Sequence, residues 1–127
     1  MKKFFVSAAV VGALLAVNSC TKEKEKSNAD YHADVTCNEA DDTLNTYNGK
    51  IGVILSSNCA GSGCHNTLSK AEGKDFSTYA ASKVSFDGVL CTVYQDGGCK
   101  PMPENAAKLS DADLHDLTCW AKNGFPQ

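Results

Sequence analysis

Apolar residues recur at helical spacing in two well-marked stretches of the chain. The first stretch predicts a helix over residues 43–57, and its apolar stripe consists of Leu44, Tyr47, Ile51, Ile54 and Leu55. The second predicts a C-terminal helix over residues 111–123, with Ser110 at the N-cap and Gly124 and Pro126 beyond its end. We expect one face of this helix to be buried against the first helix; that face consists of Leu114, Leu117, Trp120 and Ala121.

The middle of the chain has weaker patterns. Ser77 can cap a short helix over residues 78–83. A further apolar stripe stops at Asp96-Gly97-Gly98 and consists of Phe86, Val89, Leu90 and Val93. Because residues 89–94 are rich in β-branched and aromatic side chains, a strand is the alternative to a helix there.

Residues 1–19 have the pattern of an export signal, with Lys2 and Lys3 ahead of an apolar stretch too short to be a comfortable membrane span. The next residue, Cys20, ends a stretch that resembles a bacterial lipobox, Leu15-Ala16-Val17-Asn18-Ser19-Cys20. We therefore expect an exported lipoprotein, held to a membrane by a lipid on Cys20, at the periplasmic side or cell surface. An ordinary cleavage site that leaves Cys20 as a spare thiol is the alternative.

Charge separates a tether from a domain. Residues 20–36 are expected to form the lipidated N-terminus and a flexible tether, since charges alternate in sign after Cys20, and residues 37–127 to form the single domain. From Cys20 onward ten lysines and no arginine face fifteen acidic residues, a formal charge of about −5. This charge argues against nucleic acid as a partner and favours partners with a basic or neutral docking surface.

The segment Cys59-Ala60-Gly61-Ser62-Gly63-Cys64-His65 carries the most specific chemistry in the sequence. A cysteine followed directly by histidine, with a second cysteine upstream, is typical of covalently attached c-type haem. The thiols of Cys59 and Cys64 are expected to bind the haem vinyl groups, and His65 the iron. Four residues rather than two separate the cysteines, and the small intervening residues can bulge at little steric cost. A plain Cys59–Cys64 disulfide and half of a zinc site are the alternatives.

Met102, within Lys100-Pro101-Met102-Pro103, is the candidate for the second axial position. Flanking prolines restrict the backbone of this loop, and a thioether raises the reduction potential of haem iron, as suits a single-electron carrier. The competing ligands are His32 and His115, and an open or water-filled position is a further alternative. The last helix is also expected to border the haem, with Trp120 and Tyr79 either donating hydrogen bonds to propionates or packing.

The cysteines left after lipid and haem are Cys37, Cys91, Cys99 and Cys119. Four cysteines allow three pairings, and a small exported domain gains stability from disulfides. We expect Cys91 to pair with Cys99, which would close a short loop ahead of Met102. We expect Cys37 to pair with Cys119, which would tie the start of the domain to its last helix. Free or differently paired thiols are the alternative.

In their order along the chain, these segments resemble the small single-haem class I cytochrome c domains of exported lipoproteins from Bacteroidetes-type bacteria. The resemblance runs from Cys37 to Pro126 and rests on residues 47–55, 58–66, 76–81, 101–103, 108–110 and 119–124. It implies an all-α fold of three to four helices around one haem c, with Cys59 and Cys64 as thioether positions. It also implies His65 as the proximal and Met102 as the distal iron ligand.

The function that follows is electron transfer by a membrane-tethered carrier that is not an enzyme and whose partners are other redox proteins. Two alternatives belong to other classes. One is a peroxidase-like haem oxidoreductase with an open sixth position, and the other is a haem-free, disulfide-bonded binding domain.

Overall fold

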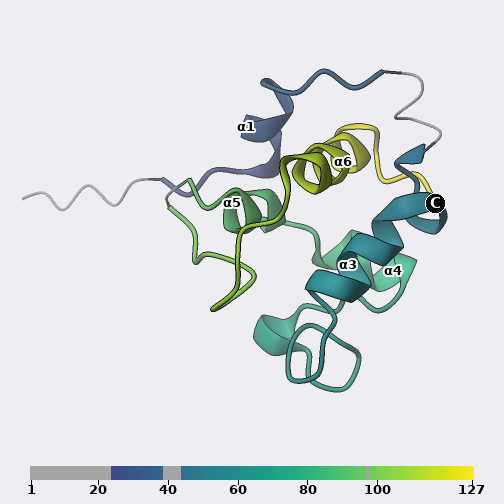
Figure 1. Cartoon of the computed structure of the whole chain (residues 1–127), viewed down its shortest axis with the longest axis vertical. Helices are drawn as coiled ribbons and strands as arrows, with labels where there is room; N and C mark the ends of the chain where they lie inside the picture. The colour runs from purple at the N-terminus through teal and green to yellow at the C-terminus, as the bar shows by residue number, and fades with distance from the viewer. Residues whose placement is uncertain (1–23, 39–43, 97) are drawn as a thin grey trace, which may run out of the picture.

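The computed structural model describes residues 24–38, 44–96 and 98–127. All regular structure within these ranges is helical, as the all-α prediction requires (Figure 1). The elements are α1 (Asn28–His32), η1 (Tyr47–Ile51), α3 (Gly52–Asn58), η2 (Ala71–Gly73), α4 (Tyr79–Ser85), α5 (Val89–Tyr94) and α6 (Asp111–Lys122). No helix in these ranges has the length and apolarity that a membrane crossing needs. The expected export signal, 1–19, and the lipidation residue Cys20 lie outside the described residues.

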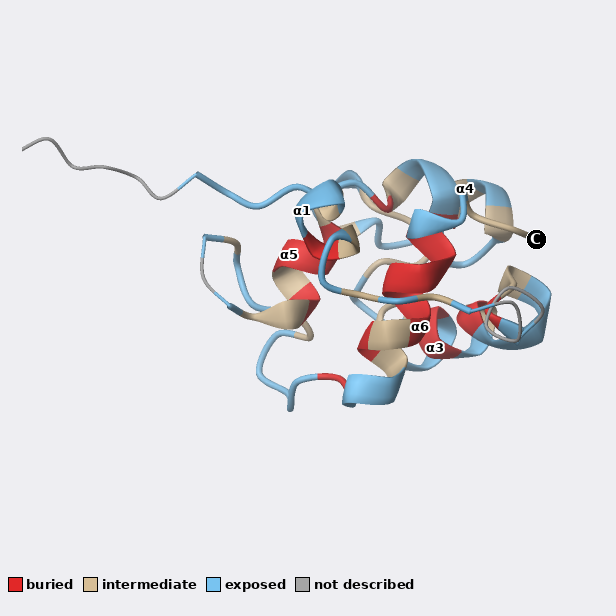
Figure 2. Ribbon diagram, turned by 90° about the horizontal axis from the view of Figure 1, so that it is seen from above, coloured by how far each residue is buried: buried red, intermediate tan, exposed pale blue. Residues whose placement is uncertain are grey.

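Helix α6 is the centre of the core. Ser110 caps it as predicted, because its Oγ accepts a hydrogen bond of 3.1 Å from the backbone N–H of Asp113. Its predicted apolar face is buried, and α6 packs against α1, α5 and η1 (Figure 2). The fully buried Trp120 meets the rings of Phe86 and Phe125 edge to face, at centroid distances of 5.2 and 4.9 Å. The contact of α6 with η1 confirms the predicted packing of the last helix on the helix predicted over residues 43–57.

The first predicted helix is a π-helical turn, η1, that continues directly into α3, so it covers residues 47–58 rather than 43–57. Thr46 caps its start by accepting a 3.0 Å hydrogen bond from the N–H of Gly49. Gly52 is required at the junction, since a Cβ there would lie 2.9 Å from the carbonyl oxygen of Tyr47. The helix buries Ile51, Ile54 and Leu55, the inner part of the predicted stripe.

The two weaker middle segments are both helices. The strand alternative for residues 89–94 is wrong, because this segment forms α5 with four buried residues. Burial on one helical face outweighs the modest strand preference of its side chains. The cap of α4 is Thr78 and not Ser77: Thr78 Oγ1 accepts from the N–H of Ala81, while Ser77 Oγ accepts from that of Thr67.

The folded domain begins earlier than predicted. Ser27 caps α1, and the side chain of Asn28 donates to Phe86 O at 2.9 Å and accepts from Leu90 N at 3.2 Å. Tyr31 is buried and stacks on Tyr94, with ring centroids 4.6 Å apart. The assignment of 20–36 as a flexible tether is therefore wrong for α1, which packs on α5 and α6.

Within the described residues, two disulfides each join a helix to a segment outside it, in the pairing expected from the sequence. Cys37 pairs with Cys119 of α6, and Cys91 of α5 pairs with Cys99. The first bridge spans 82 residues of chain and the second spans 8. The long bridge therefore constrains nearly the whole domain, and the short one constrains a single loop.

Candidate functional site

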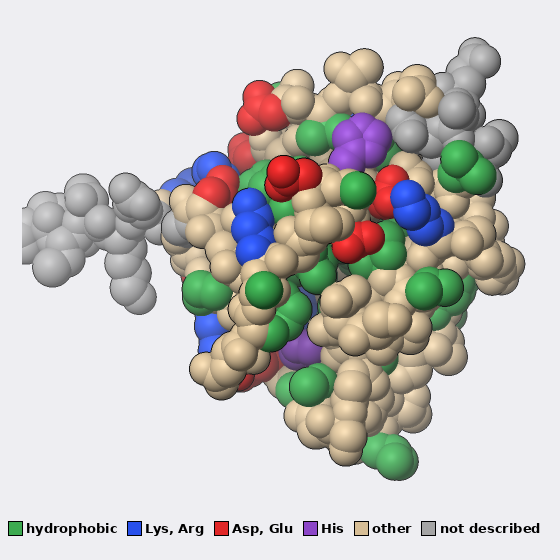
Figure 3. All heavy atoms as spheres, in the orientation of Figure 1, with side chains coloured by type: hydrophobic (Ala, Val, Ile, Leu, Met, Phe, Trp, Pro, Cys, Tyr) green, Lys and Arg blue, Asp and Glu red, His purple; other side chains and the backbone are tan. Residues whose placement is uncertain are grey.

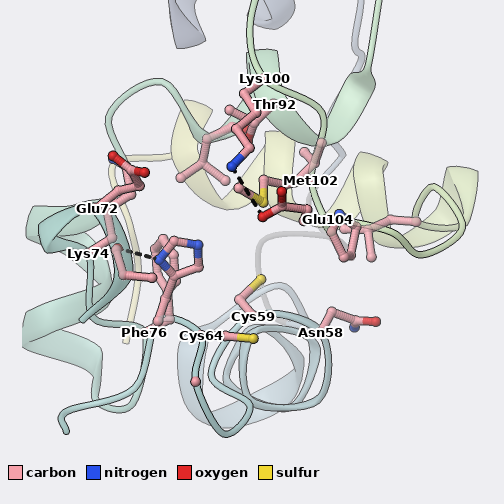
Figure 4. A pocket seen from close by; sticks show the side chains of 17 residues that line it. Asn58, Cys59, Cys64, Glu72, Lys74, Phe76, Thr92, Lys100, Met102 and Glu104 are labelled. Atoms are coloured by element: carbon pink, nitrogen blue, oxygen red, sulfur yellow. Dashed lines mark hydrogen bonds and ion pairs between the residues drawn. The ribbon is translucent and has the colours of Figure 1, made fainter. Parts of the chain in front are cut away.

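A cavity of about 390 Å³ lies between the end of α3, the loops on either side of η2, helix α5 and the loop after it. This volume is within the range of cofactor and small-ligand sites. Figure 4 shows Cys59 and Cys64 on one side of the cavity, with Met102, Thr92 and Lys100 across from them. Most of its wall is apolar and is formed in part by Phe76, Val89, Val93 and Leu109. The structure thus brings Cys59, Cys64, His65 and Met102 to a single cavity, although they lie up to 43 positions apart in the chain.

The Cys59–His65 segment forms a compact loop at the end of α3. The N–H of His65 donates to Cys59 O at 3.0 Å, and that of Cys64 donates to Gly61 O at 3.0 Å. Gly63, with φ of +76°, takes a left-handed conformation that glycine adopts without steric cost. The small residues between the cysteines thus let the segment fold back on itself at the end of α3.

The two thiols of this loop are not bonded to each other, so the structure contains no Cys59–Cys64 disulfide. They differ in environment, since Cys59 is partly buried and Cys64 is exposed. Burial, with a smaller contribution from Cys64, raises the pKa of the Cys59 thiol to about 11. Cys59 is therefore a neutral thiol at physiological pH, as an apolar wall favours.

His65 is oriented by the loop that contains η2. Its Nδ1 is 2.8 Å from the carbonyl oxygen of Ala71, a contact in which the ring nitrogen must donate. Nε2 then keeps its lone pair, which is the tautomer of a histidine that ligates a metal through Nε2. The N–H of Phe76 donates to His65 O at 2.8 Å, and its ring lies edge to face with the imidazole at 5.5 Å. The position and the tautomer of the imidazole are therefore both fixed.

Met102 is held by α5 and by the residue that ends it. The N–H of Met102 donates to Thr92 O at 3.0 Å, and its carbonyl oxygen accepts from Gln95 Nε2 at 2.9 Å. Gln95 takes a left-handed conformation, φ of +54°, which turns the chain out of α5. Both backbone polar groups of Met102 are thus satisfied, and the thioether lies at the cavity.

Four charged residues line the cavity. Lys100 forms an ion pair with Glu104, with Nζ and Oε2 3.1 Å apart. Lys74 donates instead to the carbonyl oxygens of Ser85 and Asp87 at 2.9 and 2.8 Å. Glu72 is the remaining charged lining residue. Lys100 therefore pairs with an exposed carboxylate, whereas Lys74 is bound by two backbone carbonyls.

Other sequence candidates lie elsewhere. Neither His32 nor His115 lines the cavity, and Nε2 of His115 is 3.3 Å from Thr36 O. No residue of α6, which was expected to border a haem, lines the cavity. Trp120 Nε1 and Tyr79 OH both donate to the C-terminal segment, to the carbonyl oxygens of residues 126 and 125. Their roles are packing roles, one of the two options predicted.

Within the described ranges, no three His, Cys, Asp or Glu side chains are grouped so that they could hold a metal ion. A metal that arrives inside a macrocycle needs fewer ligands from the protein, because the ring nitrogens occupy the other positions. One nitrogen and one sulfur on the same cavity are a donor set of that kind.

Sequence reasoning missed the residues that orient these donors. The carbonyl of Ala71 and the side chain of Gln95 have no motif of their own, since their roles depend on how two loops close. Comparison of the chain with protein-family models, with curated proteins and with solved structures finds no match.

Proposed function

We propose that this protein is a single-electron carrier with one covalently attached haem c in the cavity between α3 and α5. The observation that carries the proposal is the convergence of Cys59, Cys64, His65 and Met102 on that cavity. The haem-binding motif and the proline-bounded methionine lie far apart in sequence, and nothing in the local sequence pattern requires them to meet. The finer fold assignment, a class I cytochrome c domain, is part of the same proposal.

The residues of the cavity fit a haem in three respects. Cys59 and Cys64 are unbonded thiols, which covalent attachment to vinyl groups requires. The contact of His65 Nδ1 with Ala71 O leaves Nε2 as the ligating nitrogen. The wall is mainly apolar, which suits the faces of a porphyrin and excludes water.

Each residue has one role in this proposal. The thiols of Cys59 and Cys64 would each add across a vinyl group, so that sulfur bonds to one carbon and the proton goes to the other. His65 and Met102 would hold the iron through nitrogen and sulfur, and a thioether ligand favours the ferrous state. Bound haem supplies an iron that gains and loses one electron. The packed core and the two disulfides limit rearrangement when the charge changes.

The surface beside the motif loop bears on the choice of partner. On the face of the molecule that Figure 3 draws, charged side chains of both signs are intermingled over α1, α5 and α6. The part of that face formed by the motif loop, by which we mean the Cys59–His65 segment, is largely uncharged. We infer that a redox partner docks there mainly through neutral contacts, so that association depends weakly on salt.

The test is expression of the full chain in cells that mature c-type cytochromes, followed by acid–acetone extraction. Haem that stays on the protein and gives an alkaline pyridine haemochrome spectrum supports covalent attachment. An intact mass with one haem and two disulfides, and with acyl chains on Cys20, supports the remaining assignments. Full extraction of the haem, or purification of a colourless protein, rejects the proposal in favour of a haem-free domain.

The Met102→Ala variant separates a carrier from a peroxidase-like enzyme. A carrier shows a far-red sulfur-to-iron band, and this substitution should abolish it. The variant also lacks the methionine ligand, so its sixth position is open to added ligands. Leu109→Ala, a substitution in the same cavity wall that removes no donor, is the matched control and should keep the band. A wild-type protein that lacks the band and is high-spin has an open position, which favours the enzyme class; one that lacks the band and is low-spin has a histidine in place of Met102.

A further inference from the structure

The loop that presents Met102 is attached to the rest of the domain on two sides, and none of the attaching residues belongs to the Cys59–His65 segment. We define the distal loop as residues 95–96 and 98–102, the described residues from the end of α5 to the methionine. On its inner side, Cys99 is bonded to Cys91, a fully buried residue of α5. Two hydrogen bonds follow, from the N–H of Met102 to Thr92 O and from Gln95 Nε2 to Met102 O. The loop therefore leaves α5 and is fastened back onto it.

On its outer side, the distal loop is covered by the N-terminal segment. Asp96 accepts a 2.6 Å hydrogen bond from Tyr31 OH and pairs with Lys26. Glu25 lies against Gly98, since a Cβ there would be 3.4 Å from Glu25 Cα. The contact of Tyr31 with Asp96 is anchored in the core, because Tyr31 is buried and belongs to α1. The side chain of Asn28 in turn attaches α1 to the core through hydrogen bonds with Phe86 and Leu90.

From this arrangement we infer that the Cys91–Cys99 disulfide, Gln95 and the Asp96 contacts form a clamp that keeps Met102 at the iron. The inference rests on the proposed function, because it assigns these groups a role toward the haem. They are positioning residues, since none of them lines the cavity. Without the clamp the loop opens more often, Met102 leaves the iron for a larger fraction of the time, and an external ligand binds in its place.

The experiment measures imidazole affinity of the ferric holoprotein. The apparent dissociation constant is the intrinsic one divided by the fraction of molecules with an open sixth position. We expect Cys91→Ala/Cys99→Ala to raise imidazole affinity about tenfold or more, and to weaken the far-red band at temperatures well below global unfolding. Gln95→Ala removes the hydrogen bond to Met102 O, and Asp96→Ala removes the contacts with Tyr31 and Lys26. These variants test the clamp if the double variant does not fold, and each should raise the affinity severalfold.

The matched control is Cys37→Ala/Cys119→Ala, which removes the other disulfide. Neither of its residues lines the cavity, and the bridge ends in α6 rather than in α5 or the distal loop. It should lower global stability and leave imidazole affinity within about twofold of wild type. Equal affinities in all clamp variants and wild type, with haem retained and the far-red band intact, overturn the clamp and leave the carrier proposal standing. A protein that retains no haem overturns both.

Discussion

The disulfide between Cys37 and Cys119 should contribute more to global stability than the disulfide between Cys91 and Cys99. It closes a loop with a sequence separation of 82, whereas Cys91–Cys99 has a separation of 8. In the chain-entropy description of the unfolded state, such loops correspond to about 4.5 and about 2.6 kcal/mol. Because whole domains are stable by only about 5–15 kcal/mol, loss of the longer bridge removes a third or more of the total.

The assay is guanidinium unfolding of Cys37→Ala/Cys119→Ala and Cys91→Ala/Cys99→Ala beside the wild type, followed by far-ultraviolet circular dichroism. The first variant should lose about 2 kcal/mol more of the free energy of unfolding than the second. The denaturant m-values of both variants should rise, because an unfolded chain with one cross-link fewer exposes more surface. Losses that are equal, or in the reverse order, refute the assignment of the long bridge to global stability. A loss below about 1 kcal/mol for the long bridge refutes it independently.

Three further predictions follow from the site and the core. His65→Ala should lose the low-spin spectrum and most of the folded protein in maturing cells, since a bound haem would fill the core of the cavity; a stable, spectrally normal variant contradicts this. Ser110→Ala should cost about 1 kcal/mol in thermal unfolding, because the N–H of Asp113 loses its cap. The hydrogen bond from Lys26, and then that from Tyr31, lowers the pKa of Asp96, so its stabilisation is complete above the unfolded pKa of about 3.9 and is lost as pH falls through the folded value. Asp96→Asn should therefore make stability less dependent on pH between about pH 5 and 2, and an unchanged pH profile argues against the contact.

The parts of the fold that local sequence determines are those with a cap and a stripe together. Helix α6 has Ser110 before it, Gly124 after it and one apolar face, and these features suffice to place it within one residue. Helix α1 has one large apolar residue, Tyr31, in a charged segment, so its burial could not be read from any pattern. What fixes it is the side chain of Asn28, whose partners Phe86 and Leu90 lie about sixty positions away.

The same distinction applies to the site. Cysteine, histidine and methionine were found in the sequence because their chemistry and spacing are unusual at any position. Gln95 was not found, since glutamine is common on surfaces and its role comes from a left-handed turn that aims it at Met102 O. The carbonyl of Ala71 has no side-chain signal at all. Sequence thus predicts the groups that would react, and structure is needed for the groups that orient them.

The two disulfides serve different parts of this molecule. The long bridge ends in α6, at the centre of the apolar core, where none of the residues faces the cavity. The short bridge ends in α5, whose Val89, Thr92 and Val93 form part of the cavity wall. One helix therefore supports the core, and its neighbour carries the site. Because α5 packs against α6, the core fixes the position of α5. The short bridge then attaches the distal loop to α5 through Cys91 and Cys99. The cavity of about 390 Å³ therefore borders the core on the side of α5, where Val89 and Val93 belong to both, and no residue of α6 lines it.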